Sequence, residues 1–154
     1  MHPSLNTQEK PITAAAHDTP SPRRARSRGQ ALTGILELIG RLLLGVLFLV
    51  SGAGKIAGYD ATEGYMQAMG VPSVLLPAVI TLEVLGALLL FVGWKTRGVA
   101  VLLAGFSIIS GLLFHANIAD QIQLLMLLKN LSIAGGLLVL AAHGAGPYSI
   151  DARR

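Results

Sequence analysis

Four long apolar stretches dominate the chain after residue 30, over residues 35–56, 73–92, 98–116 and 122–142. Each has about the 20 residues that an α-helix, rising about 1.5 Å per residue, needs to cross about 30 Å of hydrocarbon. None alternates apolar and polar positions with a period of two, which disfavours membrane-spanning β-strands. The pattern predicts an all-α integral membrane protein, a four-helix bundle. Small residues four apart, among them Ala100/Ala104, Ser107/Gly111 and Ser132/Gly136, would let such helices pack closely.

Residues 1–30 differ in composition from the rest of the chain. They are rich in Pro, Ser, Thr, Ala and Arg and contain almost no large apolar side chains. Such a segment cannot bury enough surface to offset its chain entropy, so we expect a disordered basic tail, followed by one membrane domain over residues 31–154. Between the first two apolar stretches, the segment 59–69 places Tyr65, Met66 and Met69 so that one face could lie on the membrane surface. We expect a short interfacial helix there.

The overall composition agrees with membrane insertion. Residues of the AVILMFWYC set make up 53% of the chain and charged residues only 13%, about half the usual share of a soluble protein. The absence of Cys excludes disulfides, an iron–sulfur cluster and thiol chemistry on this chain. His115 and His143 fall at opposite ends of the predicted bundle, so they cannot ligate one haem iron. We expect neither a metal nor a covalently bound cofactor.

The distribution of charge predicts the topology. Lys and Arg concentrate in the tail, in the turn 94–97 and in residues 151–154, whereas Asp60, Glu63 and Asp120 lie in the other two loops. Under the positive-inside rule both termini are cytoplasmic and the acidic loops face outward. Although the net charge is +4, no basic face with interleaved aromatics is present, so the expected partner is the lipid bilayer and not nucleic acid.

Ionisable side chains within the predicted helices are candidate functional groups, because each needs a partner or a water-filled cavity. Glu83 and Lys129 lie on two helices that run in the same direction, at depths of about 16 and 12 Å below the outer boundary. We expect these two residues to form an ion pair, to which Asn130 could add a hydrogen bond. Such a pair is either structural or part of a polar pocket for a proton, an ion or a ligand headgroup.

The remaining polar candidates lie nearer the two membrane boundaries. Arg41 lies in the inner part of the first helix, one turn after Glu37, a spacing that favours an ion pair. Lys55 ends the same helix on the outer side, where it either reaches the headgroups or joins an outer polar group. That outer group would suit a quinone headgroup, an extracytoplasmic partner or an ordinary hydrated interface. Its other members are Tyr59, Tyr65, His115 and Asp120.

An ordered series of motifs spans residues 35–151. It consists of Arg41-x-x-x-Gly45-x-x-Phe48-x-x-x-Gly52-x-x-Lys55, Met69-Gly70-Val71-Pro72, Glu83-x-x-Gly86-Ala87, Gly93-x-x-Thr96-Arg97, Phe114-His115, Lys129-Asn130-x-x-x-x-Gly135-Gly136 and Gly146-x-x-Ser149-x-Asp151. In this order the motifs resemble the DoxX family of small four-helix bacterial membrane proteins. The resemblance implies a multi-pass protein of the bacterial inner membrane, and it assigns no catalytic residue.

The resemblance also implies a functional context. The family takes its name from a subunit associated with a thiosulfate:quinone oxidoreductase, and some members are linked to membrane oxidoreductase complexes and oxidative stress. We therefore expect an accessory, non-catalytic subunit of a quinone-linked oxidoreductase system, with a quinone as ligand and oxidoreductase subunits as partners. A small-solute or proton carrier acting as a homo-oligomer is the alternative from another class, and a structural membrane scaffold is a third.

Overall fold

A computed structural model of the chain describes residues 22–153, with side chains from residue 29 onward. Every regular element in that range is a helix: α1 (Pro22–Ala57), α2 (Tyr59–Ala68), η1 (Ser73–Leu75), α3 (Leu76–Val92), α4 (Thr96–Phe114), α5 (Gln121–His143) and η2 (Asp151–Arg153). Within the described residues, four helices are long and apolar enough to cross a membrane, over residues 29–57, 73–92, 96–114 and 121–143. The predicted all-α class and the four apolar helices are confirmed, and α2 is the short helix expected after the first stretch.

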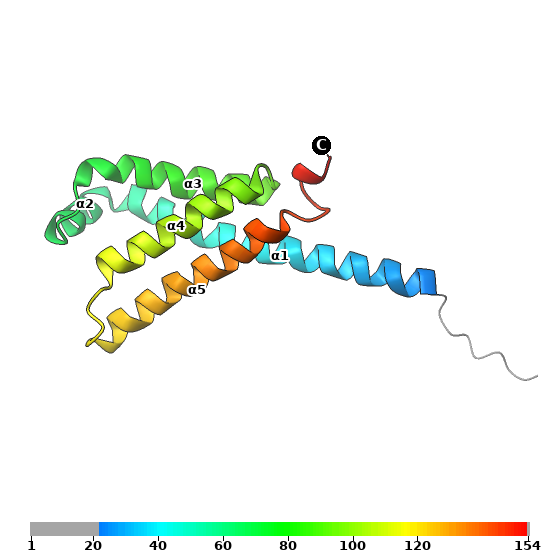
Figure 1. The fold of residues 1–154 in the computed structure, drawn as a ribbon. Coiled ribbons are helices and arrows are strands. Elements are labelled where there is room, and N and C mark those ends of the chain that lie inside the picture. Colours follow the sequence, from blue (N-terminus) through cyan, green and yellow to red (C-terminus); the bar gives the residue numbers. More distant parts are fainter. Residues whose placement is uncertain (1–21, 154) are drawn as a thin grey trace, which may run out of the picture.

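Helix α1 begins well before the apolar stretch that it contains. Its 36 residues start at Pro22, so residues 22–30, which the composition assigns to the tail, continue the helix. Ala and Arg have high helix propensity, and Pro is tolerated in the first turn because its missing N–H is not needed there. In Figure 1 this part of α1 projects beyond the other helices. The expected disorder of residues 1–21 lies outside the described residues.

The helices pack as two close pairs, α1 with α3 and α4 with α5 (Figure 1). Glycines permit the close approach. Between α1 and α3, a Cβ added to Gly45 would lie 2.5 Å from Phe91, and one added to Gly52 would lie 2.7 Å from Val84. Between α4 and α5, a Cβ added to Gly111 would lie 2.9 Å from Cβ of Asn130. The core between the pairs consists of small and aliphatic side chains with one aromatic ring: Phe48, Ala87, Leu90, Val99, Ala100, Leu103, Ala104, Ala134, Leu137 and Leu140.

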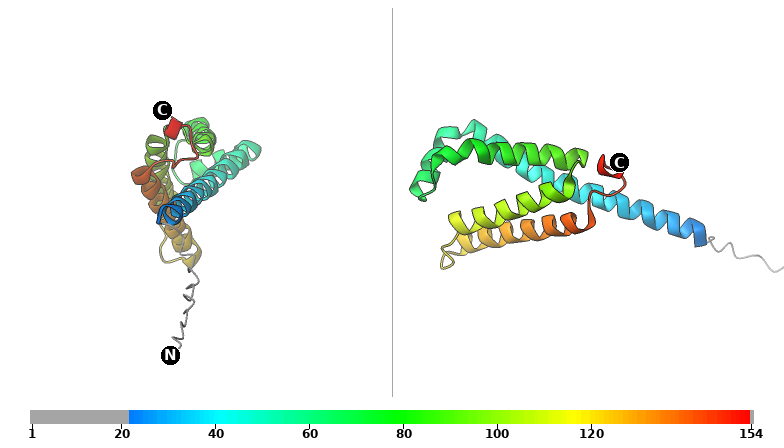
Figure 2. Two further views of the ribbon diagram at one scale, coloured as in Figure 1. Left: turned by 90° about the vertical axis from the view of Figure 1, so that its right-hand side faces the viewer. Right: turned by 45° about the horizontal axis from the view of Figure 1, so that its top comes forward.

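The two ends of the bundle are built differently. Helix α2 and the loop between α4 and α5 lie at one end, which we call the α2 end. At the other, the C-terminal end, residues 144–153 fold back over the turn between α3 and α4, where Val92 and Gly93 accept hydrogen bonds from Ile150 and Asp151. Helices α1 and α5 diverge toward the α2 end, as Figure 1 and the right-hand view of Figure 2 show.

Candidate functional site

Lys55 and Glu83 form a salt bridge inside the bundle. Lys55 Nζ lies 2.9 Å from both carboxylate oxygens of Glu83. Ser51, one turn before Lys55 on α1, donates to Glu83 Oε1 at 3.0 Å and accepts from Lys55 Nζ at 2.7 Å. The Glu83 side chain is 3% exposed and that of Lys55 25%. The pair joins α1 to α3 and satisfies two charges that would otherwise be isolated in the apolar interior.

The predicted ion pair between Glu83 and Lys129 is therefore wrong. Lys129 is exposed on α5, and its Nζ contacts Met126 Sδ at 3.3 Å. The depths of the two residues match, but α3 packs against α1 while α5 packs against α4, so Glu83 meets the lysine of α1. Asn130 is half-buried against Gly111 of α4, where it contributes to helix packing and not to the Glu83 site.

Lys55 also lines an apolar cavity at the α2 end with a volume of about 310 Å³. Two of the predicted outer candidates, Tyr65 and His115, line the same cavity. The other lining residues are Thr62, Met66, Val71, Leu75, Val79, Phe106, Ile109, Ser110, Leu113 and Phe114. The structure thus brings Lys55, Tyr65 and His115 to one mostly apolar space, with Glu83 and Ser51 directly bonded to the lysine.

The polar side chains of this α2-end cavity are held by specific neighbours. The Tyr65 ring stacks on Phe114, with ring centroids 5.4 Å apart. His115 directly follows α4, and its Nδ1 lies 2.7 Å from Gln123 Oε1 of α5. With this oxygen as acceptor the imidazole proton is assigned to Nδ1, which leaves Nε2 able to accept a hydrogen bond.

The other two outer candidates do not belong to the cavity lining. Asp120 caps α5, because its carboxylate accepts from the backbone N–H groups of Ile122 and Gln123 at 2.8 and 3.0 Å. Tyr59 is exposed at the first residue of α2. The outer polar group that the sequence suggests is therefore divided between a cavity wall, a helix cap and a surface tyrosine.

Arg41 lies apart from all of these residues, at the C-terminal end. It is 1% exposed, and its guanidinium donates to the backbone carbonyls of Ala145 and Tyr148 at 3.2 and 2.7 Å. The expected ion pair of Arg41 with Glu37 does not form. Among the described residues, the salt bridge is the one between Lys55 and Glu83. Arg41 thus anchors the C-terminal segment to α1. Gly93, which has φ of 68°, leaves room for this side chain, because an added Cβ there would overlap the Arg41 guanidinium.

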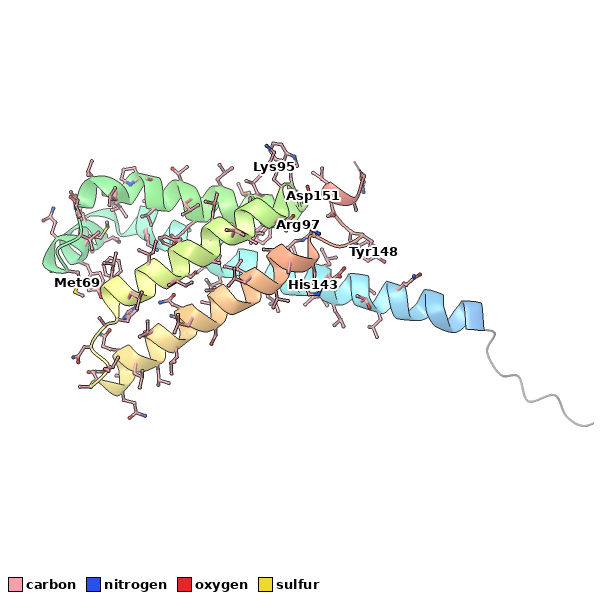
Figure 3. All side chains as sticks on the ribbon, in the orientation of Figure 1. Met69, Lys95, Arg97, His143, Tyr148 and Asp151 are labelled. Carbon is pink, nitrogen blue, oxygen red and sulfur yellow. The ribbon has the colours of Figure 1, made fainter. Side chains whose placement is uncertain are left out.

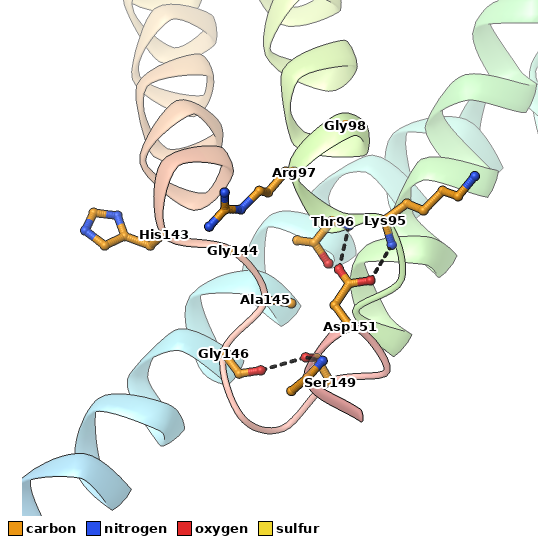
Figure 4. Close-up of a pocket in the computed structure, with 11 residues that line it drawn as sticks. Lys95, Thr96, Arg97, Gly98, His143, Gly144, Ala145, Gly146, Ser149 and Asp151 are labelled. Carbon is orange, nitrogen blue, oxygen red and sulfur yellow. Dashed lines mark hydrogen bonds between the residues drawn. The ribbon is translucent and has the colours of Figure 1, made fainter. Parts of the chain in front are cut away.

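A second cavity, of about 660 Å³, opens at the C-terminal end. Asp151 forms part of its wall and accepts from the backbone N–H groups of Lys95 and Thr96 at 2.8 and 2.9 Å, which caps α4 (Figure 4). Figure 3 shows basic side chains near this end, among them Lys95, Arg97 and His143. Lys95 and His143 point away from each other (Figure 4), so the basic groups do not converge on one ligand position.

Sequence reasoning missed several residues that hold these sites together. The spacing of Ser51 and Lys55, one helical turn apart, is a signal that could have indicated their contact. No comparable signal links Gln123 to His115 or Asp151 to Lys95. Those contacts depend on how the loop between α4 and α5 and the C-terminal segment fold.

Comparison with known proteins places the chain in a family. The DoxX family model matches residues 36–116. Inner membrane protein YqjF of Escherichia coli K12 is 49% identical over 114 residues, which cover 74% of this chain and 88% of YqjF. Inner membrane protein YphA of the same organism is 34% identical over 126 residues, covering 77% of this chain and 90% of YphA.

A more distant similarity and a negative result complete the comparison. CatD of Bacillus subtilis 168, a protein named as an oxidoreductase, is 34% identical over 67 residues, or 44% of this chain and half of CatD. No solved structure matches the chain. The family match, the similarity to two inner-membrane proteins and the four apolar helices lead to one conclusion: the chain belongs to the DoxX family and is a multi-pass inner-membrane protein.

Proposed function

We propose that the protein binds a quinone in the α2-end cavity and serves as an accessory subunit of a quinone-linked membrane oxidoreductase. The observation that supports this proposal is the placement of Lys55, Tyr65 and His115 around one apolar space inside a membrane protein. Small-molecule sites are mostly apolar clefts with a few polar groups that fix orientation, with volumes from about 300 Å³ upward. A cavity of about 310 Å³ suits a single headgroup ring.

The polar groups match the two redox forms of a quinone. A quinone offers two carbonyl acceptors. The Tyr65 hydroxyl can donate to one of them, and Lys55 can donate to the other by exchanging one of its three N–H bonds to Glu83 and Ser51 for the ligand. A hydroquinone offers two hydroxyl donors, one of which His115 Nε2 can accept while Nδ1 remains bound to Gln123. The apolar walls, including Phe106 and Phe114, suit the ring faces. The isoprenoid tail would remain in the surrounding lipid.

The accessory role assigns electron transfer to a partner. In this proposal the chain holds and orients the quinone, a partner subunit exchanges two electrons with it, and two protons are exchanged with water. Part of this chain is similar to CatD, which is named as an oxidoreductase, and that name supports such a context.

Photolabelling with a radiolabelled azidoquinone tests the binding. The full-length protein is purified in mild detergent and illuminated with the probe, with and without excess unlabelled ubiquinone or menaquinone. We expect competed label on peptides that line the α2-end cavity. Ser110→Leu, which replaces the hydroxyl of a lining residue with a larger, branched isopropyl group, should reduce the competed label at least tenfold. Ser132→Leu makes the same change on an exposed position of α5 and should leave the label unchanged.

Other outcomes would reject the proposal. Label that is not competed, or that is equal in Ser110→Leu and in the wild type, would exclude a quinone site in this cavity. Solute or proton flux through the purified protein in liposomes, in the absence of quinone binding, would favour the carrier alternative. Neither binding nor flux would leave the scaffold alternative.

A further inference from the structure

Lys129 is a charged side chain within a membrane-spanning helix that lacks an acidic partner among the described residues. It is exposed, and its Nζ contacts Met126 Sδ. It lies eight residues after Gln121, the first residue of α5, which at about 1.5 Å per residue puts its Cα about 12 Å from that helix end. A lysine at the centre of a spanning helix costs roughly 2.5–3.5 kcal/mol on the insertion scale.

The face of α5 that carries Lys129 also carries small side chains. At about 100° per residue, Leu125, Ser132 and Gly136 lie within about 60° of Lys129 around the helix axis. All three are exposed, although the small pair Ser132/Gly136 has the spacing that typically brings two helix backbones together. Near the C-terminal end this face meets Leu44 of α1, which lies 3.8 Å from a Cβ built on Gly136. Toward the α2 end, α1 and α5 diverge (Figures 1 and 2).

The charge on this face selects the kind of partner. A second copy of this chain offers two acidic residues within its spanning segments, Glu37 and Glu83. Glu83 is buried and bound by Lys55, and Glu37 lies against Gly146 at the C-terminal end. Neither can reach a lysine of α5 near the α2 end of another copy. The other acidic residues at the α2 end, Asp60, Glu63 and Asp120, lie outside the spanning helices. A carboxylate within the membrane at the depth of Lys129 therefore has to come from a different protein.

We infer that the face of α5 formed by Leu125, Lys129, Ser132 and Gly136 docks a transmembrane helix of a partner protein that carries an Asp or Glu at the depth of Lys129. The small residues allow close packing, and the carboxylate neutralises the lysine. The inference extends the accessory role proposed above by naming the surface and the chemistry of the partner, and it does not depend on quinone binding.

Site-specific photocrosslinking in native membranes tests the docking face. A benzophenone amino acid replaces Leu125, which lies on the docking face and is 55% exposed. As the control it replaces Leu131, which is 42% exposed and lies roughly 200° around α5 from Lys129. We expect a protein adduct from position 125 and at least fivefold less from position 131. Lys129→Met should reduce the adduct at position 125 at least fivefold, whereas Lys129→Arg should preserve it. Sequencing of the crosslinked peptide should place it in a transmembrane helix that contains Asp or Glu.

A charge exchange then identifies the contact. Lys129→Glu should abolish the adduct, and changing the acidic residue of the crosslinked partner helix to Lys should restore it. An adduct of two copies of this chain, an adduct that is unaffected by Lys129→Met, or label on lipid alone would overturn the inference. The Ser110→Leu variant separates this inference from the quinone proposal, because it should lose quinone labelling and retain the adduct.

Discussion

At the scale of single residues, the central feature is the group of Ser51, Lys55 and Glu83. An isolated charge in hydrocarbon is costly, and removing one partner of a buried ion pair leaves the other uncompensated. The serine hydroxyl bonds to both charged groups, so it fixes the orientation of the pair as well as its distance. Because this group adjoins the α2-end cavity through Lys55, it also keeps a positive charge at the cavity wall.

A double-mutant cycle distinguishes the pair of Lys55 and Glu83 from the pair of Glu83 and Lys129 that their matching depths predicted. Lys55→Met and Glu83→Gln should each destabilise the bundle by up to about 3 kcal/mol, the low end for buried pairs because Lys55 is partly exposed. The loss in the double variant should be clearly smaller than the sum of the single losses. Lys129→Met combined with Glu83→Gln serves as the control and should be additive. Unfolding in detergent measures all the variants, and additivity in the Lys55 cycle would contradict the structure.

At the scale of elements, α4 depends on residues far along the chain. The residue that precedes it, Lys95, has φ of 49° and makes no side-chain cap. Asp151 supplies the missing acceptors, for the backbone N–H groups of Lys95 and Thr96. The turn before α4 also needs Gly93, since an added Cβ there would meet Arg41 and Ser149. The start of α4 is therefore built by the C-terminal segment.

Replacement of Asp151 tests this long-range cap. Asp151→Ala should cost about 0.5–2 kcal/mol, the usual range for loss of a helix N-cap. Asp151→Asn retains one oxygen acceptor and should cost less. Amide hydrogen exchange in detergent should accelerate at Lys95 and Thr96 in Asp151→Ala and remain slow at Leu103 in the core. Unchanged exchange at both first-turn amides would show that the carboxylate does not cap the helix.

The elements themselves could be predicted from sequence, whereas their pairing could not. Long apolar stretches determine the spanning helices because composition and length suffice for that decision. Depth counting gives the position of Glu83 along its helix but not the direction in which it faces. That direction follows from the contact of Gly52 with Val84 and Glu83 of α3, which brings α1 close. The bonds of Arg41 to Ala145 and Tyr148 require a fold of the C-terminal segment that no periodicity encodes.

At the scale of the whole molecule, the charge distribution still predicts the orientation. In this predicted orientation both termini are cytoplasmic, and α2 and its end of the bundle face outward. Since the wild type has no Cys, single introduced cysteines report the topology cleanly. A membrane-impermeant maleimide applied to intact cells should label Glu63→Cys and should not label Arg97→Cys until the membrane is permeabilised. The reverse labelling would invert the orientation.

The bond between Arg41 and the C-terminal segment has a consequence for biogenesis. The arginine enters the membrane with the first helix, but its acceptor Ala145 follows 104 residues later. At about 5–20 residues per second, that interval lasts roughly 5–20 s. During this time the guanidinium must remain hydrated or be shielded by lipid headgroups or insertion factors. Residues synthesised more than 100 positions later therefore complete the contacts of the first helix, and a nascent chain arrested before Ala145 should be a preferred substrate for membrane proteases.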